Sequence, residues 1–220
     1  MQCSMFGKLP SKRDFVSYNM TRPFLDHWET WLQTAVATSR LALGETWQVS
    51  FLNAPIWRFW FGADIFGQQV TGALMPSVDG VGRYFPLSVC ACATNGFRLL
   101  TPPALALDQW HENCEQFLLS MLEDQLAGDP STLLEALPFA PIAPDGVIAP
   151  SIENPATWIS PSGSLDAAFA SLKAMNDDSI HRRRCYWWTV GGGFHHACLI
   201  ARNGSPEPEF LTQMITSKFT

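Results

Sequence analysis

The residues best suited to chemistry lie in Gly72–Leu87, where two apolar runs flank a polar turn. Proline presets φ and glycine permits positive φ, so the Pro and Gly residues here favour a turn. Ser77 stands two residues before Asp79, and Arg83 follows four residues later. The sequence around Ser77 is no nucleophile elbow, so we predict no catalytic serine. Asp79 and Arg83 instead predict an ion pair, which needs good geometry to offset its desolvation.

The other residues that could take part in catalysis or metal binding do not indicate a reaction. Gly191–Gly193 lacks the spacing of a phosphate-binding loop and predicts a hairpin turn. His195 and His196 adjoin this turn, and because adjacent residues of a strand point to opposite faces, the pair does not suit one metal ion. The six cysteines contain no CxxC pair and are expected to be reduced thiols in the core. We therefore expect no catalytic residue, no metal and no cofactor.

The composition excludes several classes of protein. Hydrophobic residues make up 47% of the chain and charged residues 15%, with nine Trp and fifteen Phe, which is enough for a substantial core. The formal charge of −6 argues against non-specific binding of nucleic acid. No apolar run is long enough to span a bilayer, and the N-terminus lacks a hydrophobic signal segment. We expect a cytoplasmic protein that binds no nucleic acid and inserts into no membrane.

The first half of the chain predicts one helix followed by antiparallel strands. Apolar residues recur at helical spacing over Phe24–Arg40, which predicts an amphipathic helix. Phe6–Asn19 shows no clean periodicity and is expected to be an ordered loop. Short intervals between the following apolar runs favour antiparallel hairpins. Strands are predicted at Trp47–Leu52, Ile56–Gly62, Gln69–Met75 and Tyr84–Ala93.

The second half predicts mainly helices, with two more strands near its end. The expected helices are Ala104–Leu126, Ser131–Leu137, Ser164–Met175 and Glu207–Phe219, and the expected strands are Cys185–Val190 and His196–Ala201. The proline-rich stretch at about 138–161 is expected to be a surface loop. We predict a single α/β domain of the α+β type over 1–220, with a mainly antiparallel central sheet flanked by helices. A relation to longin-like regulatory domains is a further expectation.

Charged residues gather around the aromatic positions of the N-terminal half. Arg58 lies inside an aromatic strand and is expected to stack on a ring or to pair with Asp79 or Asp14. The group either forms a surface that binds a partner or ties the N-terminal segment to the hairpin. A further alternative is an Arg-lined pocket for a small ligand or phosphate, in a binding protein or an enzyme. The candidate residues are Lys8, Arg13, Asp14, Arg58, Ser77, Asp79, Arg83 and Tyr84.

Three motifs in a fixed order carry a family resemblance. They are FGKLPSKRDFV at Phe6–Val16, APIWRF at Ala54–Phe59 and the hairpin segment Gly72–Leu87, with CYWWT at Cys185–Thr189 as a weaker fourth. Together they resemble the TagF/ImpM family associated with type VI secretion. The resemblance implies a post-translational negative regulator of bacterial type VI secretion that has no catalytic residues. Some relatives carry a phosphatase domain, for which this chain has neither the room nor the motifs.

The resemblance also implies a partner, a cytosolic scaffold protein that bears a forkhead-associated domain. Binding by an acidic globular protein would lower the concentration of scaffold that is free to assemble. We therefore expect a non-catalytic regulator that sequesters this scaffold. The sequence indicates no particular oligomeric state.

Overall fold

The computed structural model describes residues 2–94, 96–102, 104–123, 128–144, 158–160, 165–169 and 180–219. The strands are β1 (Ser4–Gly7), β2 (Val16–Tyr18), β3 (Trp57–Phe61), β4 (Val70–Met75), β5 (Leu87–Cys92), β6 (Phe97–Leu99), β7 (Ile142–Pro144), β8 (Trp158–Ser160), β9 (Arg184–Thr189) and β10 (Cys198–Asn203). The α-helices are α1 (Arg22–Leu43), α2 (Trp47–Leu52), α3 (Ala63–Phe66), α4 (Leu105–Ser120), α5 (Pro130–Glu135) and α7 (Phe210–Thr216), and 165–169 is also helical. The 3₁₀ turns are η1 (Gly44–Thr46) and η2 (Ile180–Arg183).

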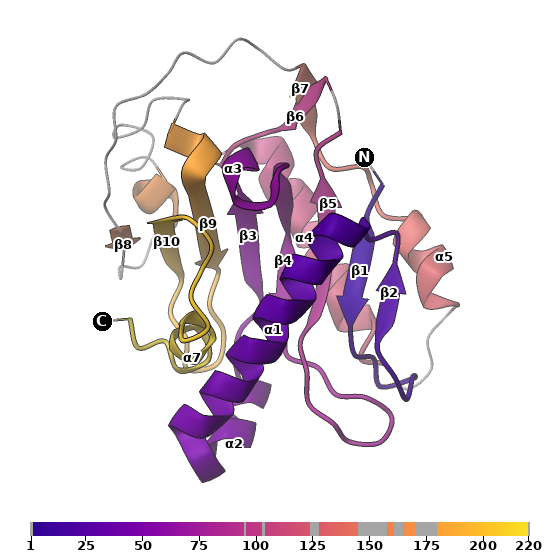
Figure 1. Cartoon of the computed structure of the whole chain (residues 1–220), viewed down its shortest axis with the longest axis vertical. Coiled ribbons are helices and arrows are strands. Elements are labelled where there is room, and N and C mark those ends of the chain that lie inside the picture. Colours follow the sequence, from indigo (N-terminus) through magenta and orange to yellow (C-terminus); the bar gives the residue numbers. More distant parts are fainter. Residues whose placement is uncertain are drawn as a thin grey trace.

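An eight-stranded sheet forms the centre of the structure, with the strand order β2-β1-β5-β4-β3-β9-β10-β8. Every described pairing in it is antiparallel, and β6 pairs with β7 in a separate two-stranded sheet. Helix α1 crosses one face of the sheet and α4 lies behind the other (Figure 1). The N-terminal and C-terminal halves of the chain are joined in the sheet where β3 pairs with β9. The predicted α/β class with an antiparallel sheet and flanking helices is confirmed.

The strands are almost continuously apolar because helices cover both faces of the sheet. Alternate residues of a strand point to opposite faces. In β3, Trp57, Phe59 and Phe61 face the α1 side, whereas Trp60 belongs to the core on the α4 side. All the side chains of β3 and β4 are buried. This double burial explains why these strands lack the apolar–polar alternation that is typical of a sheet with one face in water.

Trp28 lies at the centre of the core under α1. Its ring packs against Phe59 at 5.0 Å and Trp31 at 5.1 Å between ring centroids, and its indole N–H donates to Ser88 Oγ at 2.9 Å. The Ser88 hydroxyl in turn donates to the carbonyl oxygen of Phe6, on the neighbouring strand β1. Helix α1 is thus fixed to the sheet by large aromatic contacts and by a satisfied polar group. The tryptophans of the predicted helix are core residues, as expected.

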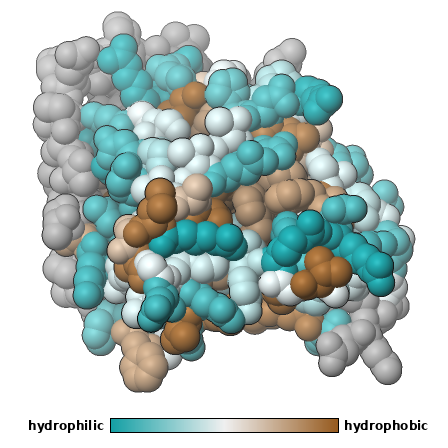
Figure 2. Space-filling model, turned by 60° about the horizontal axis from the view of Figure 1, so that its bottom comes forward, coloured by the Kyte–Doolittle hydropathy of each residue, from teal (hydrophilic) through white to brown (hydrophobic). Residues whose placement is uncertain are grey.

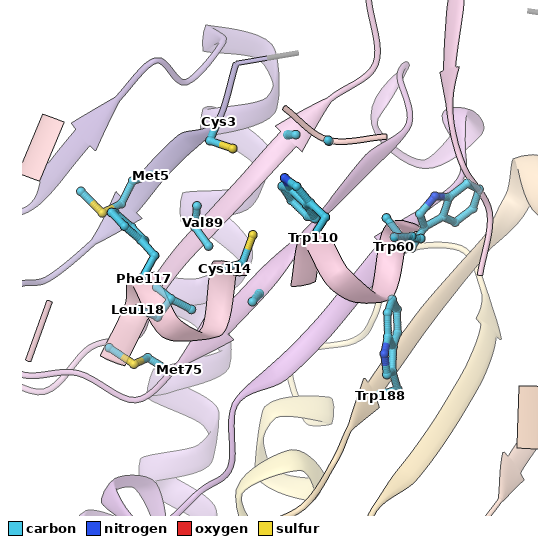
Figure 3. Packing of buried hydrophobic residues seen from close by; sticks show 14 of the residues in the cluster. Cys3, Met5, Trp60, Met75, Val89, Trp110, Cys114, Phe117, Leu118 and Trp188 are labelled. Atoms are coloured by element: carbon cyan, nitrogen blue, oxygen red, sulfur yellow. The ribbon is translucent and has the colours of Figure 1, made fainter. Parts of the chain in front are cut away.

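The second core lies between the sheet and α4. Figure 3 shows Trp110, Cys114, Phe117 and Leu118 of this helix packed over β-strand residues such as Val89. Each of these helix residues is buried, and Cys114 is fully inaccessible. Among the described residues all six cysteines are free thiols, five of them buried. The predicted role as small core residues is confirmed for these five, whereas Cys92 is only partly buried.

Two of the elements predicted in the first half of the chain are wrong. Trp47–Leu52 was expected to be a strand because it is rich in aromatic and β-branched residues, but the segment is helix α2. The helix buries only Trp47 and Phe51, which are one turn apart, and leaves Val49 exposed. Phe6–Asn19 was expected to be a loop, but its ends belong to β1 and β2. Strand β1 is held by long-range pairing with β5, which local periodicity does not reveal.

The remaining predictions differ from the structure mainly at element ends. The helix predicted at Phe24–Arg40 is α1, and the strands at Ile56–Gly62 and Gln69–Met75 are β3 and β4. Helix α4 ends at Ser120, short of the predicted Leu126. The loop predicted at about 138–161 is wrong at 142–144 and 158–160, which are strands β7 and β8, and the prediction for 145–157 and 161 lies outside the described residues. The predicted helix at 164–175 is helical at 165–169, and its other residues lie outside the described part.

Candidate functional site

The candidate site is built on the β4–β5 loop, residues 76–86, at the lower end of the sheet in Figure 1. The loop is closed on itself by hydrogen bonds from Asp79 N to the Arg83 carbonyl at 3.1 Å and from Gly82 N to the Asp79 carbonyl at 2.9 Å. Val78 and Tyr84 form an isolated β-bridge across it. Gly82 has a φ of +84°, which an L side chain adopts only with strain. The turn predicted from Gly and Pro residues is therefore a tightly specified loop.

Asp79 is the centre of the loop, and its side chain is fully buried. Its Oδ2 accepts hydrogen bonds from Lys8 Nζ and Arg83 Nε, both at 2.7 Å. Its Oδ1 accepts hydrogen bonds from the backbone N–H groups of Val81 at 3.1 Å and Arg83 at 2.9 Å. Four donors, two of them cationic, offset the desolvation of one carboxylate. The predicted pairing of Asp79 with Arg83 is confirmed.

Ser77 and Lys8 tie the N-terminal segment to this loop. The Ser77 hydroxyl donates to the Lys8 carbonyl oxygen at 2.7 Å, and Gly80 N donates to the Lys12 carbonyl oxygen at 2.8 Å. Ser77 and Lys8 are both buried, and Lys8 Nζ lies 5.1 Å from the centre of the Phe15 ring. These contacts are what the structural alternative for the cluster predicted. The buried part of the candidate site therefore holds the fold together.

Arg83 connects the buried centre to an exposed rim. Its side chain is 54% exposed, and its Nη2 donates to the Arg13 carbonyl oxygen and lies 3.6 Å from Asp14 Oδ1. Asp14 is 93% exposed, and Arg13 is also exposed. Hence Arg13, Asp14 and the outer half of Arg83 form the accessible part of the cluster. Charged groups at such exposure contribute little to stability but remain free to meet a partner.

The hydrogen bonds at the centre control the charge of the Asp79 carboxyl. Burial by itself raises its pKa, but hydrogen bonds from Lys8, from the backbone and side chain of Arg83 and from the Val81 amide lower it more. The net result is a pKa well below the usual range of an aspartate. The hydrogen bond to Asp79 also raises the pKa of Arg83, against the opposing effect of burial. Asp79 is therefore ionised at any physiological pH.

This arrangement predicts an acid-dependent loss of stability. Because the folded pKa of Asp79 is depressed, its contribution is fully present above the unfolded pKa of about 4 and is lost as the pH falls toward the folded pKa. We expect the free energy of unfolding of the wild type to fall more steeply between about pH 4 and pH 2 than that of Asp79→Asn. Urea titrations across this range measure the two slopes, and parallel slopes would contradict the assignment.

Tyr84 links the loop to α1 and α2. Its hydroxyl oxygen accepts a hydrogen bond from Gln48 Nε2 at 2.6 Å, and its ring lies 6.1 Å from that of Trp47. Its backbone carbonyl accepts a hydrogen bond from Arg40 Nη2 at 3.3 Å. The Arg40 guanidinium in turn stacks over the Trp47 ring at 4.3 Å. Tyr84 is therefore half-buried beside a second arginine, which the sequence did not single out.

A groove of about 640 Å³ lies between α1 and the β4–β5 loop. We call it the basic groove, because three of its lining residues are cationic and none is acidic. Figure 2 turns this end of the molecule forward and shows hydrophobic and hydrophilic residues closely interleaved on it. The residues that matter most to the basic groove are Lys8, Phe15, Val36, Arg40, Arg83 and Tyr84.

Arg58 is not part of this cluster, so its expected pairing with Asp79 or Asp14 is wrong. It lies on β3 and pairs with Glu115 of α4 through Nε to Oε1 at 2.7 Å and Nη2 to Oε2 at 3.1 Å. Asp108 Oδ1 lies 4.0 Å from its Nη1. The alternation of β3 sends Arg58 to the α4 face, together with Trp60 and away from the α1 face that borders the basic groove. Arg58 therefore joins the sheet to α4.

His111 completes the polar contacts beneath α4. Its Nδ1 lies 2.9 Å from the Leu107 carbonyl oxygen and its Nε2 3.0 Å from Thr71 Oγ1. Burial, helped by the positive charge of Arg58, lowers the pKa of His111 to about 3, so the imidazole is neutral. Both ring nitrogens of His111 thus have partners, and the residue is structural. Within the described ranges, no group of three or more His, Cys, Asp or Glu side chains is placed to hold a metal ion.

Sequence reasoning missed Arg40 and Glu115. Arg40 follows Val36 by one turn on the predicted helix, so an exposed cation there borders an apolar strip. Glu115 follows His111 by one turn, beside the buried strip of α4. An acidic residue at that position signals a buried cation as partner, because burial of a lone carboxylate is costly. Which cation Glu115 contacts depends on how α4 packs against the sheet.

The structure is similar to the crystal structure of PA0076 from Pseudomonas aeruginosa PAO1, with a TM-score of 0.77 and a sequence identity of 27%. The match covers 100% of this chain and 96% of that chain. No curated protein matches the sequence. No helix in the described part is both long and apolar enough to cross a membrane. The model of the TagF N-terminal domain, described as type VI secretion system-associated, matches residues 4–137. This chain therefore belongs to the TagF family of type VI secretion-associated proteins.

Proposed function

We propose that this protein restrains type VI secretion in the cytoplasm by binding a scaffold protein that carries a forkhead-associated domain. The match of residues 4–137 to the type VI secretion-associated TagF domain is the observation that carries the proposal. The matched range contains the loop, the N-terminal segment tied to it and α1. Binding alone is enough for restraint, because a bound scaffold is withdrawn from assembly by mass action. The proposed role involves no catalysis.

The accessible rim of the β4–β5 loop supports a binding role. Arg83 and Phe15 are about half exposed there, and Tyr84 lies beside them. Arginine and aromatic side chains supply much of the binding energy in protein interfaces. The rim stands on a loop that Asp79 holds rigid, so little conformational entropy is lost on binding. These features favour a protein partner over a reaction.

Calorimetric titration of the full-length chain with the purified scaffold from the same secretion gene cluster tests this function. We expect saturable binding without nucleotide and without phosphorylation of either protein. An acidic globular protein of similar size, titrated in the same way, controls for non-specific association. Absence of heat at several temperatures, together with separate elution of the two proteins on size exclusion, would refute direct binding.

The alternative is a protein that binds a small anionic ligand such as phosphate. The volume and cationic lining of the basic groove favour it, because small-ligand sites commonly enclose about 300–1,000 Å³. Arg58 has no part in such a pocket, since it pairs with Glu115 under α4. Titration with inorganic phosphate distinguishes the two functions: saturable phosphate binding without scaffold binding would favour the alternative.

A further inference from the structure

The basic groove has a local charge opposite to that of the whole protein. The chain carries a formal charge of −6, yet the groove is lined by Lys8, Arg40 and Arg83 and by no acidic side chain. Lys8 is already neutralised by Asp79 at 2.7 Å. Arg83 is shared among Asp79, the Arg13 carbonyl and Asp14. The positive charge available to an incoming group therefore centres on Arg40.

Arg40 is held in place and lacks a carboxylate. Its guanidinium stacks on Trp47 and donates one hydrogen bond to the Tyr84 carbonyl oxygen, so its conformation is set before anything binds. Within the described part of the chain, no acidic group lies within ion-pair distance of it, and the side chain is exposed. A guanidinium binds a carboxylate through two parallel hydrogen bonds. Preorganisation lowers the entropic cost of that pairing.

The walls of the groove indicate what accompanies the carboxylate. Val36 and Ala37 of α1 line one side, and Phe15 and Phe85 line the region near the loop. Phe15 is 43% exposed although its ring packs against Phe6 and Phe85. An apolar side chain placed here would cover aromatic surface that is now in contact with water. As far as the described residues show, the groove thus combines an arginine that has no carboxylate partner with an apolar wall.

We propose that the basic groove binds an extended acidic segment of the protein partner, with an Asp or Glu on Arg40 and a neighbouring apolar residue against Phe15 and Ala37. This inference rests on the proposed function and names the surface and the chemistry by which the scaffold is recognised. Charge complementarity explains how a protein of net negative charge attracts an acidic segment to one face only. Because Arg40 is exposed, the strength of this contact falls as salt concentration rises.

Arg40→Glu is the direct test, measured by calorimetric titration of the full-length variant with the purified scaffold. We expect the affinity to fall at least about tenfold, because attraction at a rigid arginine becomes repulsion. Arg22→Glu is the matched control: it makes the same charge change on the same helix, at an 85% exposed side chain that does not line the groove. We expect this control to change the affinity less than about twofold.

Arg40→Glu also removes the contacts with Trp47 and Tyr84, so a second variant guards against misfolding. Ala37→Glu places a carboxylate in the groove from an exposed helix position and removes no hydrogen bond. We expect it to weaken scaffold binding as Arg40→Glu does, with unchanged circular dichroism and urea midpoint.

The possible outcomes separate this inference from the proposed function. If the wild type binds the scaffold and neither groove variant weakens that binding, the proposed role of the basic groove is refuted, while the proposed function stands. Absence of wild-type binding would overturn both. If the wild type self-associates and Arg40→Glu abolishes that self-association without affecting the scaffold, the occupant is a second copy of this chain and the inference is wrong.

Discussion

Asp79→Ala is expected to lower the free energy of unfolding by about 3 kcal/mol or more, because it leaves a buried cation without its carboxylate. Lys8 is 7% exposed in its side chain and has Asp79 as its only ion-pair partner in the described part of the chain. Two backbone amides in the loop lose their acceptor at the same time. Lys8 Nζ, as a buried donor left without its partner, adds its own desolvation penalty. Urea denaturation followed by circular dichroism measures the loss.

Two comparison variants show whether this loss comes from the buried centre. Asp14→Ala removes the other carboxylate near Arg83, but that side chain is 93% exposed, so we expect a change within about 0.5 kcal/mol. Lys8→Met should cost less than Asp79→Ala, because Asp79 keeps Arg83 and two amide donors. Equal stability of Asp79→Ala and Asp14→Ala would show that the loop does not depend on its central carboxylate.

Glu115→Gln is expected to cost about 2–4 kcal/mol, because it removes the charge that balances the buried Arg58. The Arg58 side chain is 6% exposed, and its two short hydrogen bonds both go to the Glu115 carboxylate. Asp108, at 4.0 Å, is too distant to replace them as a hydrogen-bond acceptor. The amide of Gln keeps the shape of the side chain, so the loss reports charge and hydrogen bonding. The shift in urea midpoint measures it.

Glu112→Gln provides the matched control on the same helix. Glu112 is exposed, and no hydrogen bond or ion pair in the described part of the structure uses its carboxylate. We expect its effect on the urea midpoint to be within the error of the measurement. A similar loss for the two variants would mean that α4 responds to net charge in general and not to the pair with Arg58.

The expected losses of stability for Asp79→Ala and Glu115→Gln determine which variants are suitable for binding experiments. Charge reversal at Lys8 or Arg58 is expected to unfold the protein, since both side chains are buried in ion pairs. Loss of scaffold binding in such variants would report loss of the fold. Arg83 is part structural and part exposed, so its variants mix both effects. Ala37 is an exposed groove position whose side chain makes no hydrogen bond, so its change bears least on the core, whereas Arg40 is exposed but contacts Trp47 and Tyr84.

The sequence predicted the elements whose local pattern agrees with their packing. Helix α1 was found because its buried residues recur at helical spacing, and β3 and β4 because they are short apolar runs between turn residues. Helix α2 was missed because Trp47, Val49 and Phe51 also fit a strand, and only tertiary contact decides which of them are buried. Strand β1 was missed because its partners, β2 and β5, determine it.

In the candidate site, too, local contacts could be predicted from the sequence and long-range contacts could not. The chain by itself determined the β4–β5 loop and its ion pair, because Asp79 and Arg83 are four residues apart and the Gly residues permit the turn between them. Only the tertiary structure decided that Lys8 reaches Asp79, that Arg58 reaches Glu115, and that Arg40 borders the groove. These contacts join residues far apart in the sequence. Their partners depend on the register of the sheet and on which face each helix covers, and no local pattern records either.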